Sequence, residues 1–242
     1  MTRARRHWKG AVSGGVVMLV LLVVGIPYLY IHVVEGKQPA PLALSDVPSL
    51  TGSTPDLSGS GTPSGKPGSI DGVWRVTEGS QAGYRVDETL AGQSTTAVGR
   101  TSAVTGSVTI SGRFITAASF TVQMASVTSD RNQRDQQFSG RIMDTAQYPT
   151  GTFVLTKPIG LGRTPRIGKV ITVQATGNLT LHGTTRPVTF SVSAKRTTDQ
   201  IAATGEIPIT YGDYNIDNPS FGGFVSVGSS GTVEFLLVLT RT

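Results

Sequence analysis

The 242-residue sequence contains no cysteine and only three histidines, two of which, His7 and His32, lie near the N-terminus. The absence of cysteine excludes disulfides, thiolate metal sites and a cysteine nucleophile. Because His182 is the single histidine of residues 71–242, one chain cannot assemble a multi-histidine zinc or iron site. We therefore expect no metal and no cofactor.

The sequence also lacks a basic run beyond its N-terminal tail. Residues 71–242 carry 15 Lys and Arg against 12 Asp and Glu, and four of the other basic residues of this +6 chain lie in the first ten positions. Nucleic-acid binding normally requires a clustered basic surface with interleaved aromatic residues. We therefore expect no nucleic-acid partner.

No set of catalytic residues can be nominated. A catalytic histidine needs a nucleophile and an orienting acid that converge on it, and the sequence has no Gly-x-Ser-x-Gly elbow. His182 lies in the segment Leu181-His182-Gly183-Thr184, which we predict to be a solvent-facing turn with left-handed backbone. The chain is not expected to be an enzyme.

The N-terminal region has the pattern of a membrane anchor. Residues 1–10 form a basic tail, and residues 11–34 contain no Asp, Glu, Lys or Arg. A helix of that length spans about 36 Å, enough for a bilayer core near 30 Å. The basic tail predicts a single-pass helix with a cytoplasmic N-terminus and everything after residue 34 outside the cell membrane. A cleaved signal peptide is the alternative, but the apolar run exceeds the ~7–15 residues that such peptides use, and Pro41-Leu42-Ala43 is a poor cleavage site.

Residues 35–70 are rich in Pro, Gly and Ser. A segment of this composition buries too little apolar surface to offset the entropy lost on ordering. We expect a disordered linker that leaves the orientation of the folded domain, residues 71–242, free.

The folded domain shows the two-residue alternation of half-buried antiparallel strands. We predict strands over residues 73–76, 83–90, 104–110, 118–124, 152–156, 171–181, 188–194, 201–209 and 233–239. Between Asn132 and Asp144 the pattern changes, because Phe138 and Ile142 lie four apart, as on a short helix, where Asp130 and Arg134 can also pair. The sequence predicts an all-β fold: an antiparallel barrel of about eight strands, which closes its own edges, with one short helix.

Many residues on the predicted inward faces are small. They are Gly106, Ala118, Ala175, Gly177, Ala194, Ala203 and Gly205. Either they leave an apolar cavity inside the barrel, or they only permit tight coiling of the strands.

Three segments together resemble the YceI-like family. They run from Arg134-Asp135 to Phe138, from Tyr148-Pro149 to Phe153, and from Gly177 to Phe190. The resemblance implies a lipocalin-like barrel that binds a polyisoprenoid or a similar long apolar lipid, here tethered to a membrane, for sequestration or transfer. The alternative is a ligand-free envelope module that binds a partner protein. Many relatives also have a histidine after the first long strand, and the segment Gly83–Glu88 and its surroundings have none.

We predict that inward-facing side chains of the strands and the helix, with the Tyr-Pro turn, contact the lipid. These are Tyr84, Val86, Phe120, Val122, Phe138, Ile142, Tyr148, Phe153, Val173, Leu179, Phe190, Val192, Ile207, Phe235 and Leu237.

Other polar and aromatic residues have two interpretations each. Arg134, with Arg131 or Arg141, either contacts a lipid phosphate or ties the helix to the barrel rim. Glu88 points inward in the register of Tyr84 and would need a partner such as Arg85 or Arg100. The turn-rich segment 211–224, with Phe221 and Phe224, either closes the barrel as a lid or packs on its outside.

Overall fold

The protein is described from a computed structural model, which describes residues 38–47, 69–90, 92–223 and 225–241. The predicted basic tail 1–10 and transmembrane helix 11–34 lie outside these residues. None of the helices within the described ranges combines the length and the apolar character that a bilayer crossing requires.

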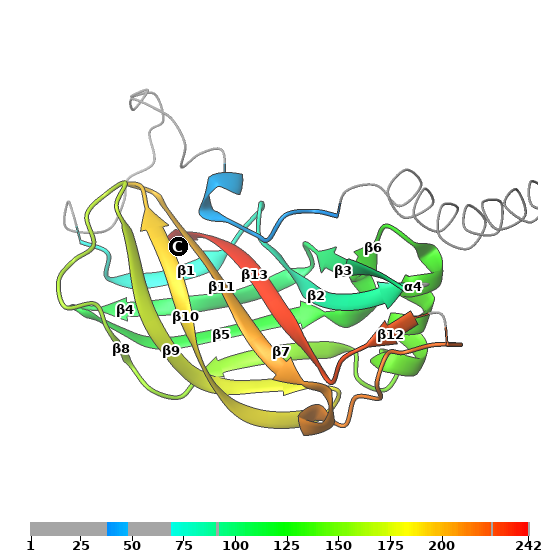
Figure 1. Ribbon diagram of the computed structural model, residues 1–242. Coiled ribbons are helices and arrows are strands. Elements are labelled where there is room, and N and C mark those ends of the chain that lie inside the picture. The colour runs from blue at the N-terminus through cyan, green and yellow to red at the C-terminus, as the bar shows by residue number, and fades with distance from the viewer. Residues whose placement is uncertain (1–37, 48–68, 91, 224, 242) are drawn as a thin grey trace, which may run out of the picture.

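The described residues fold as an antiparallel β-barrel of eight strands, as predicted (Figure 1). Around the barrel the order is β1, β4, β5, β7, β9, β10, β11 and β13, and β1 pairs with β13 to close the ring. The bounds of these strands are β1 Gly72–Val76, β4 Val104–Ser111, β5 Phe114–Gln123, β7 Thr150–Leu155, β9 Val170–Leu181, β10 Thr184–Arg196, β11 Gln200–Thr210 and β13 Ser230–Arg241.

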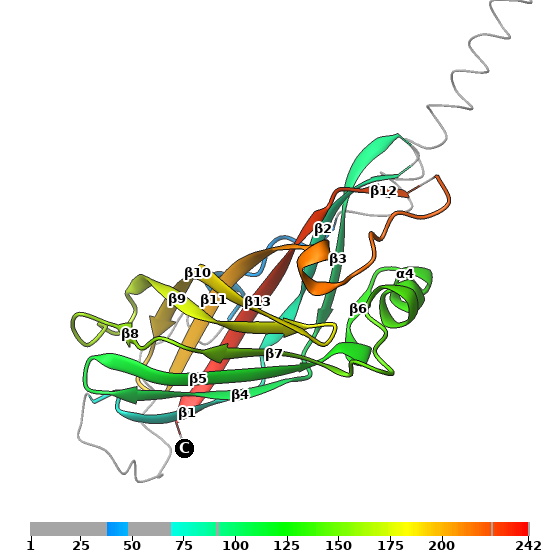
Figure 2. The same cartoon turned by 90° about the horizontal axis from the view of Figure 1, so that it is seen from below.

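Strand β13 has two partners along one of its edges. Residues 239–241 pair with β1, whereas residues 232–236 pair with β2 (Gln81–Leu90). Strand β2 pairs with β3 (Gln93–Thr101), and β3 reaches the short β6 (Thr128–Ser129), which follows β5. The wall is therefore completed by β1 at one end of the barrel and by β2, β3 and β6 at the other, where β2 and β3 extend past the neighbouring strands (Figure 2). We did not predict β3, because Gln93–Thr101 has only weak alternation of apolar and polar residues.

The predicted helix lies beside the β6 end of the barrel. Helix α4 (Asn132–Gln137) continues as a π-helical turn, η5 (Phe138–Ile142). Phe138 and Met143 are buried against the barrel, and Arg134 pairs with Asp130 one turn earlier, as expected. The remaining short elements are η3 Leu44–Asp46, η4 Met124–Ser126, β8 Ile159–Gly160, η6 Tyr211–Tyr214 and β12 Val225–Val227.

The prediction of a disordered linker over residues 35–70 is wrong for residues 38–47, which we call the strap. The strap lies on the outside of the barrel, with a 3₁₀ turn at Leu44–Asp46. Leu42 and Val47 are buried against Ala202, Leu236 and Val238 on the outer faces of β11 and β13. The composition of the segment does not predict this contact, because two apolar side chains are enough to hold the strap on an apolar patch of the barrel. Ile70 is also buried, beside Trp74, and residues 35–37 and 48–68 lie outside the described ranges.

Candidate functional site

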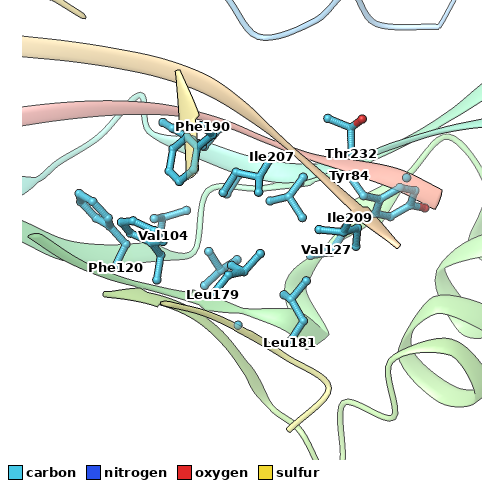
Figure 3. A pocket seen from close by; sticks show the side chains of 18 of the residues that line it. Tyr84, Val104, Phe120, Val127, Leu179, Leu181, Phe190, Ile207, Ile209 and Thr232 are labelled. Atoms are coloured by element: carbon cyan, nitrogen blue, oxygen red, sulfur yellow. The ribbon is translucent and has the colours of Figure 1, made fainter. Parts of the chain in front are cut away.

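The barrel encloses an apolar cavity of about 560 Å³. This volume falls within the roughly 300–1,000 Å³ typical of ligand pockets. Side chains from opposite walls converge on it, among them Phe120, Leu179, Phe190 and Ile207 (Figure 3). The lining runs from Leu239 near the β1 end to Glu88 near α4, so the cavity follows the length of the barrel.

Fourteen of the fifteen residues predicted to contact a lipid line this cavity. They are Tyr84, Val86, Phe120, Val122, Phe138, Ile142, Phe153, Val173, Leu179, Phe190, Val192, Ile207, Phe235 and Leu237. Their binding role stays a prediction, but the structure gathers them around one space. The cavity has other lining residues that were not predicted, such as Val127, Leu155, Ile209 and Tyr211. For Leu155 and Ile209 the same alternation was the available signal.

Tyr148 is the exception, because it does not line the cavity. Its ring packs edge-on against the His182 ring, with centroids 4.5 Å apart. It also lies over Gly183, where a Cβ atom would come within 2.5 Å of the ring. The Tyr148 ring therefore holds the start of β7 against the turn between β9 and β10.

The turn at His182 has left-handed backbone, with φ of 47° at His182 and 71° at Gly183, as predicted. The expectation that His182 faces solvent is wrong, since its side chain is half-buried and its Nδ1 atom is buried without a hydrogen-bond partner among the described residues. No cluster of three His, Asp or Glu side chains within the described ranges could hold a metal ion.

The small residues predicted on the inward faces serve two purposes. Ala118, Ala175, Ala194 and Ala203 line the cavity and leave it open. The glycines instead seat aromatic rings: a Cβ atom at Gly106, Gly177 or Gly205 would lie 2.4–2.7 Å from the ring of Phe120, Phe153 or Phe235, respectively. Because these rings lie flat against the barrel wall over the glycines, they leave the lumen open. Aromatic side chains commonly cover strand glycines in this way.

Apolar side chains pack together at the end of the barrel farther from α4. Trp74 is 2% exposed and donates a hydrogen bond from Nε1 to the Ile70 carbonyl oxygen (2.9 Å). It packs with Val108, Ile110 and Leu239, which also line the cavity. We call the opposite end, where α4 and β12 lie, the mouth.

The mouth carries a polar cluster. Glu88 is 8% exposed and accepts a hydrogen bond from Arg134 (Nη2 to Oε1, 3.1 Å), and Arg134 also pairs with Asp130. Asp135 accepts hydrogen bonds from the backbone N–H (2.8 Å) and hydroxyl (2.6 Å) of Ser129. These contacts tie α4 to β2 and β6, as the structural interpretation expects, and Arg134 also lines the cavity, so a contact with a lipid phosphate stays a prediction.

The expectation that Arg85 or Arg100 pairs with Glu88 is wrong. Both lie on the outward faces of β2 and β3, because their positions alternate with inward-facing neighbours. They pair there with Glu234 of β13, at 3.2 Å and 2.7 Å, and Glu234 is only 1% exposed.

Segment 211–223 and β12 border the mouth. Tyr211, Ile216, Pro219 and Phe221 line the cavity. Arg141 donates hydrogen bonds to the carbonyl oxygens of Asn218 (3.3 Å) and Pro219 (3.2 Å), which fastens the segment to η5. Phe221 is 52% exposed, and Phe224 lies outside the described residues. A lid role for this segment stays a prediction.

Two tyrosines lie near the mouth, Tyr84 partly buried and Tyr211 buried. Burial raises the pKa of Tyr84, which stacks on Phe138 at 5.1 Å between ring centroids. Burial, with a smaller contribution from Asp87, raises the pKa of Tyr211 to about 12. Tyr211 lines the cavity, and its hydroxyl is buried and has no hydrogen-bond partner among the described residues.

Alkaline titration is expected to leave Tyr84 and Tyr211 un-ionised while the barrel stays folded. An unfolded tyrosine ionises near pH 10. With raised pKa values in the folded state, their contribution to stability is complete below pH 10 and is lost as the pH rises towards 12. Phenolate absorbance and Trp74 fluorescence measure ionisation and unfolding together. The double variant Tyr84→Phe/Tyr211→Phe should unfold at higher pH, and ionisation of all six tyrosines near pH 10 in the intact fold would contradict the assignment.

Comparison with known proteins gives a family and a fold. The YceI-like domain family matches residues 74–239. A solved polyisoprenoid-binding domain from Saccharophagus degradans, implicated in plant cell wall breakdown, is 16% identical, with a TM-score of 0.59 over 70% of this chain and 98% of that one.

Two further solved structures have lower TM-scores. BcnA from Burkholderia cenocepacia is 21% identical, with a TM-score of 0.49 over 64% of this chain and 95% of that one. A Campylobacter jejuni YceI protein is 12% identical, with a TM-score of 0.48 over 57% and 81%. No curated protein sequence matches the chain.

Proposed function

This chain belongs to the YceI-like family, and from that premise we propose that its barrel holds one long apolar chain of the polyisoprenoid type. The cavity is the observation that carries the proposal, since it is elongated and lined by aliphatic and aromatic side chains, and apolar residues pack at its end farther from α4. The similar domain from Saccharophagus degradans is described as polyisoprenoid-binding, which supports the same class of ligand.

Burial of an apolar chain supplies the affinity. Each methylene group moved from water into such a cavity contributes about 0.8 kcal/mol, so about twenty carbons contribute about 16 kcal/mol before costs. Association and ordering cost about 4–15 kcal/mol. A lipid that fills most of the cavity therefore binds tightly, whereas a short fragment does not.

The membrane role completes the proposal. The apolar run 11–34 anchors the chain as a single-pass cell-membrane protein, with its N-terminus in the cytoplasm and the barrel on the outer side. There it sequesters or transfers lipid. The ligand-free envelope module is the second candidate, but it requires a core filled by side chains, and the cavity weighs against it.

Titration of the purified full chain, in mild detergent, with a fluorescent polyprenol tests the proposal. We expect saturable binding of one lipid per chain, both for the polyprenol and for squalene, a hydrocarbon without a head group, because burial in the apolar cavity supplies the affinity. Absence of saturable binding by either lipid would overturn the proposed function.

A further inference from the structure

The strap, residues 38–47, is held on the barrel by polar as well as apolar contacts. Thr204 of β11 donates a hydrogen bond to the Leu42 carbonyl oxygen (2.9 Å). Arg85 donates from Nη2 to the Pro39 carbonyl oxygen (2.8 Å), and Arg100 donates from Nη2 to that of Ala40. Together with the burial of Leu42 and Val47, these contacts give the strap one defined path over the barrel.

The same arginines bind the buried Glu234, so the strap closes over a charged cluster. Glu234 accepts from the Nε atoms of Arg85 and Arg100, and each arginine directs a second nitrogen to the strap. A buried carboxylate requires such partners. The strap and the barrel wall are therefore coupled through one hydrogen-bonded network.

The N-terminal end of the strap lies at the mouth. Gln38 donates from Nε2 to Asp130 (3.1 Å), and Asp130 pairs with Arg134, which lines the cavity. Figure 1 shows the strap running from its short helical turn along the outside of β2 towards the α4 end. Gln38 is thus two side-chain contacts away from the cavity lining.

Only three residues, 35–37, separate Gln38 from the apolar run that ends at residue 34. Even fully extended, the four steps from residue 34 to residue 38 cover at most about 14 Å. A membrane anchor at 11–34 therefore brings the mouth close to the bilayer surface, whatever the path of residues 48–68.

We propose that the strap orients the barrel with its mouth towards the lipid bilayer, so that a lipid tail passes directly between membrane and cavity. This inference rests on the proposed membrane anchor. The half-exposed Phe221 at the mouth suits contact with a lipid surface. The opposite end offers the rival orientation, because Phe114, Ile167 and Val170 are exposed there.

Fluorescence energy transfer measures the orientation, and the absence of cysteine permits single-site labelling. Donors are placed at Gln136→Cys on α4 or at Thr164→Cys in the loop between β8 and β9, both exposed. The full chain is reconstituted in phosphatidylcholine–phosphatidylglycerol vesicles with acceptor-labelled headgroups. Because β9 has twelve residues and barrel strands are tilted, the two ends lie roughly 30 Å apart. We expect transfer from position 136 to exceed that from position 164 by a factor of roughly two or more.

Matched spacer insertions separate an orienting strap from a free linker. In one variant, twelve Gly and Ser residues are inserted after Glu35, which adds about 20 Å of flexible chain between the apolar run and the strap. In the other, the same twelve residues are inserted after Gly59, on the C-terminal side of the strap. The first insertion should abolish the difference between the two labels, and the second should leave it intact. Leu42→Asp/Val47→Asp, which detaches the strap, should act like the first insertion.

Three results would overturn the proposal: equal transfer from both labels in the unmodified chain, stronger transfer from position 164, or failure of the chain to insert into vesicles. None of them removes the lipid-binding function, because polyprenol titration in detergent reports on that separately.

Discussion

Replacing Ala175 with phenylalanine is expected to lower the affinity of the barrel for a polyprenol by about 100-fold or more. Ala175 lies on β9 opposite Phe190, is 3% exposed and points into the cavity. The added ring displaces about six ligand carbons, worth about 5 kcal/mol at 0.8 kcal/mol each, of which rerouting of the flexible chain recovers part. The measurement is the same fluorescent titration of the full chain.

The neighbouring residue provides a matched control. Gln174 lies on the same strand with its side chain exposed on the outer face. Gln174→Phe introduces the same ring on the outer face, where it does not enter the cavity. The affinity of this variant for the polyprenol should stay within about twofold of that of the unmodified chain. Equal affinities for Ala175→Phe and the unmodified protein, with both folded, would show that lipid does not occupy the cavity.

Glu234→Ala is expected to destabilise the folded domain by about 3 kcal/mol and to release the strap. Removal of one partner of a buried ion pair typically costs about 3–5 kcal/mol, because the remaining charge is left uncompensated. The low end applies here, since Arg85 and Arg100 keep 18% and 20% of their side chains exposed. Urea unfolding followed by Trp74 fluorescence should show a midpoint lower by about 1–2 M, at a slope of about 2 kcal/mol per M.

Glu206 is the control for this variant. It lies opposite Glu234 in the register of β11 and β13 but is exposed. Glu206→Gln should change the free energy of unfolding by less than about 0.5 kcal/mol. Should Glu234→Ala unfold at the same urea concentration as Glu206→Gln, the buried cluster would have no role in stability.

The sequence allowed prediction of the barrel and most of its lining because strand alternation is a local signal. The inward register of a strand such as β9 follows once one apolar face is identified, and a shift of one residue would expose that face. The short helix was predictable for the same reason, from the spacing of Phe138 and Ile142 and the pairing of Asp130 with Arg134.

The features that escaped prediction depend on contacts between distant parts of the chain. The partners of Glu234 come from β2 and β3, and the partner of Glu88 comes from α4. No local pattern tells which of several arginines meets a buried carboxylate. The strap escaped for a similar reason: its burial depends on an apolar patch on the outer face of β11 and β13, which forms only when the barrel does.

Tyr148 shows the limit of inference from a motif. The Tyr-Pro turn leads directly into a strand, since β7 begins at Thr150. The direction of the tyrosine ring, however, is set by Gly183, which gives it a surface on the far side of the turn. A side chain at a strand entry can face either side, and only the neighbouring hairpin decides.

The most direct test of the central claim is to identify what the barrel carries. The full chain and its Ala175→Phe variant are purified from the membranes in which they are expressed, extracted with organic solvent, and the extracts compared by mass spectrometry. The account predicts close to one polyisoprenoid-type lipid per unmodified chain and little or none in the variant. Lipid-free extracts from both proteins, or equal amounts of lipid in both, would contradict it.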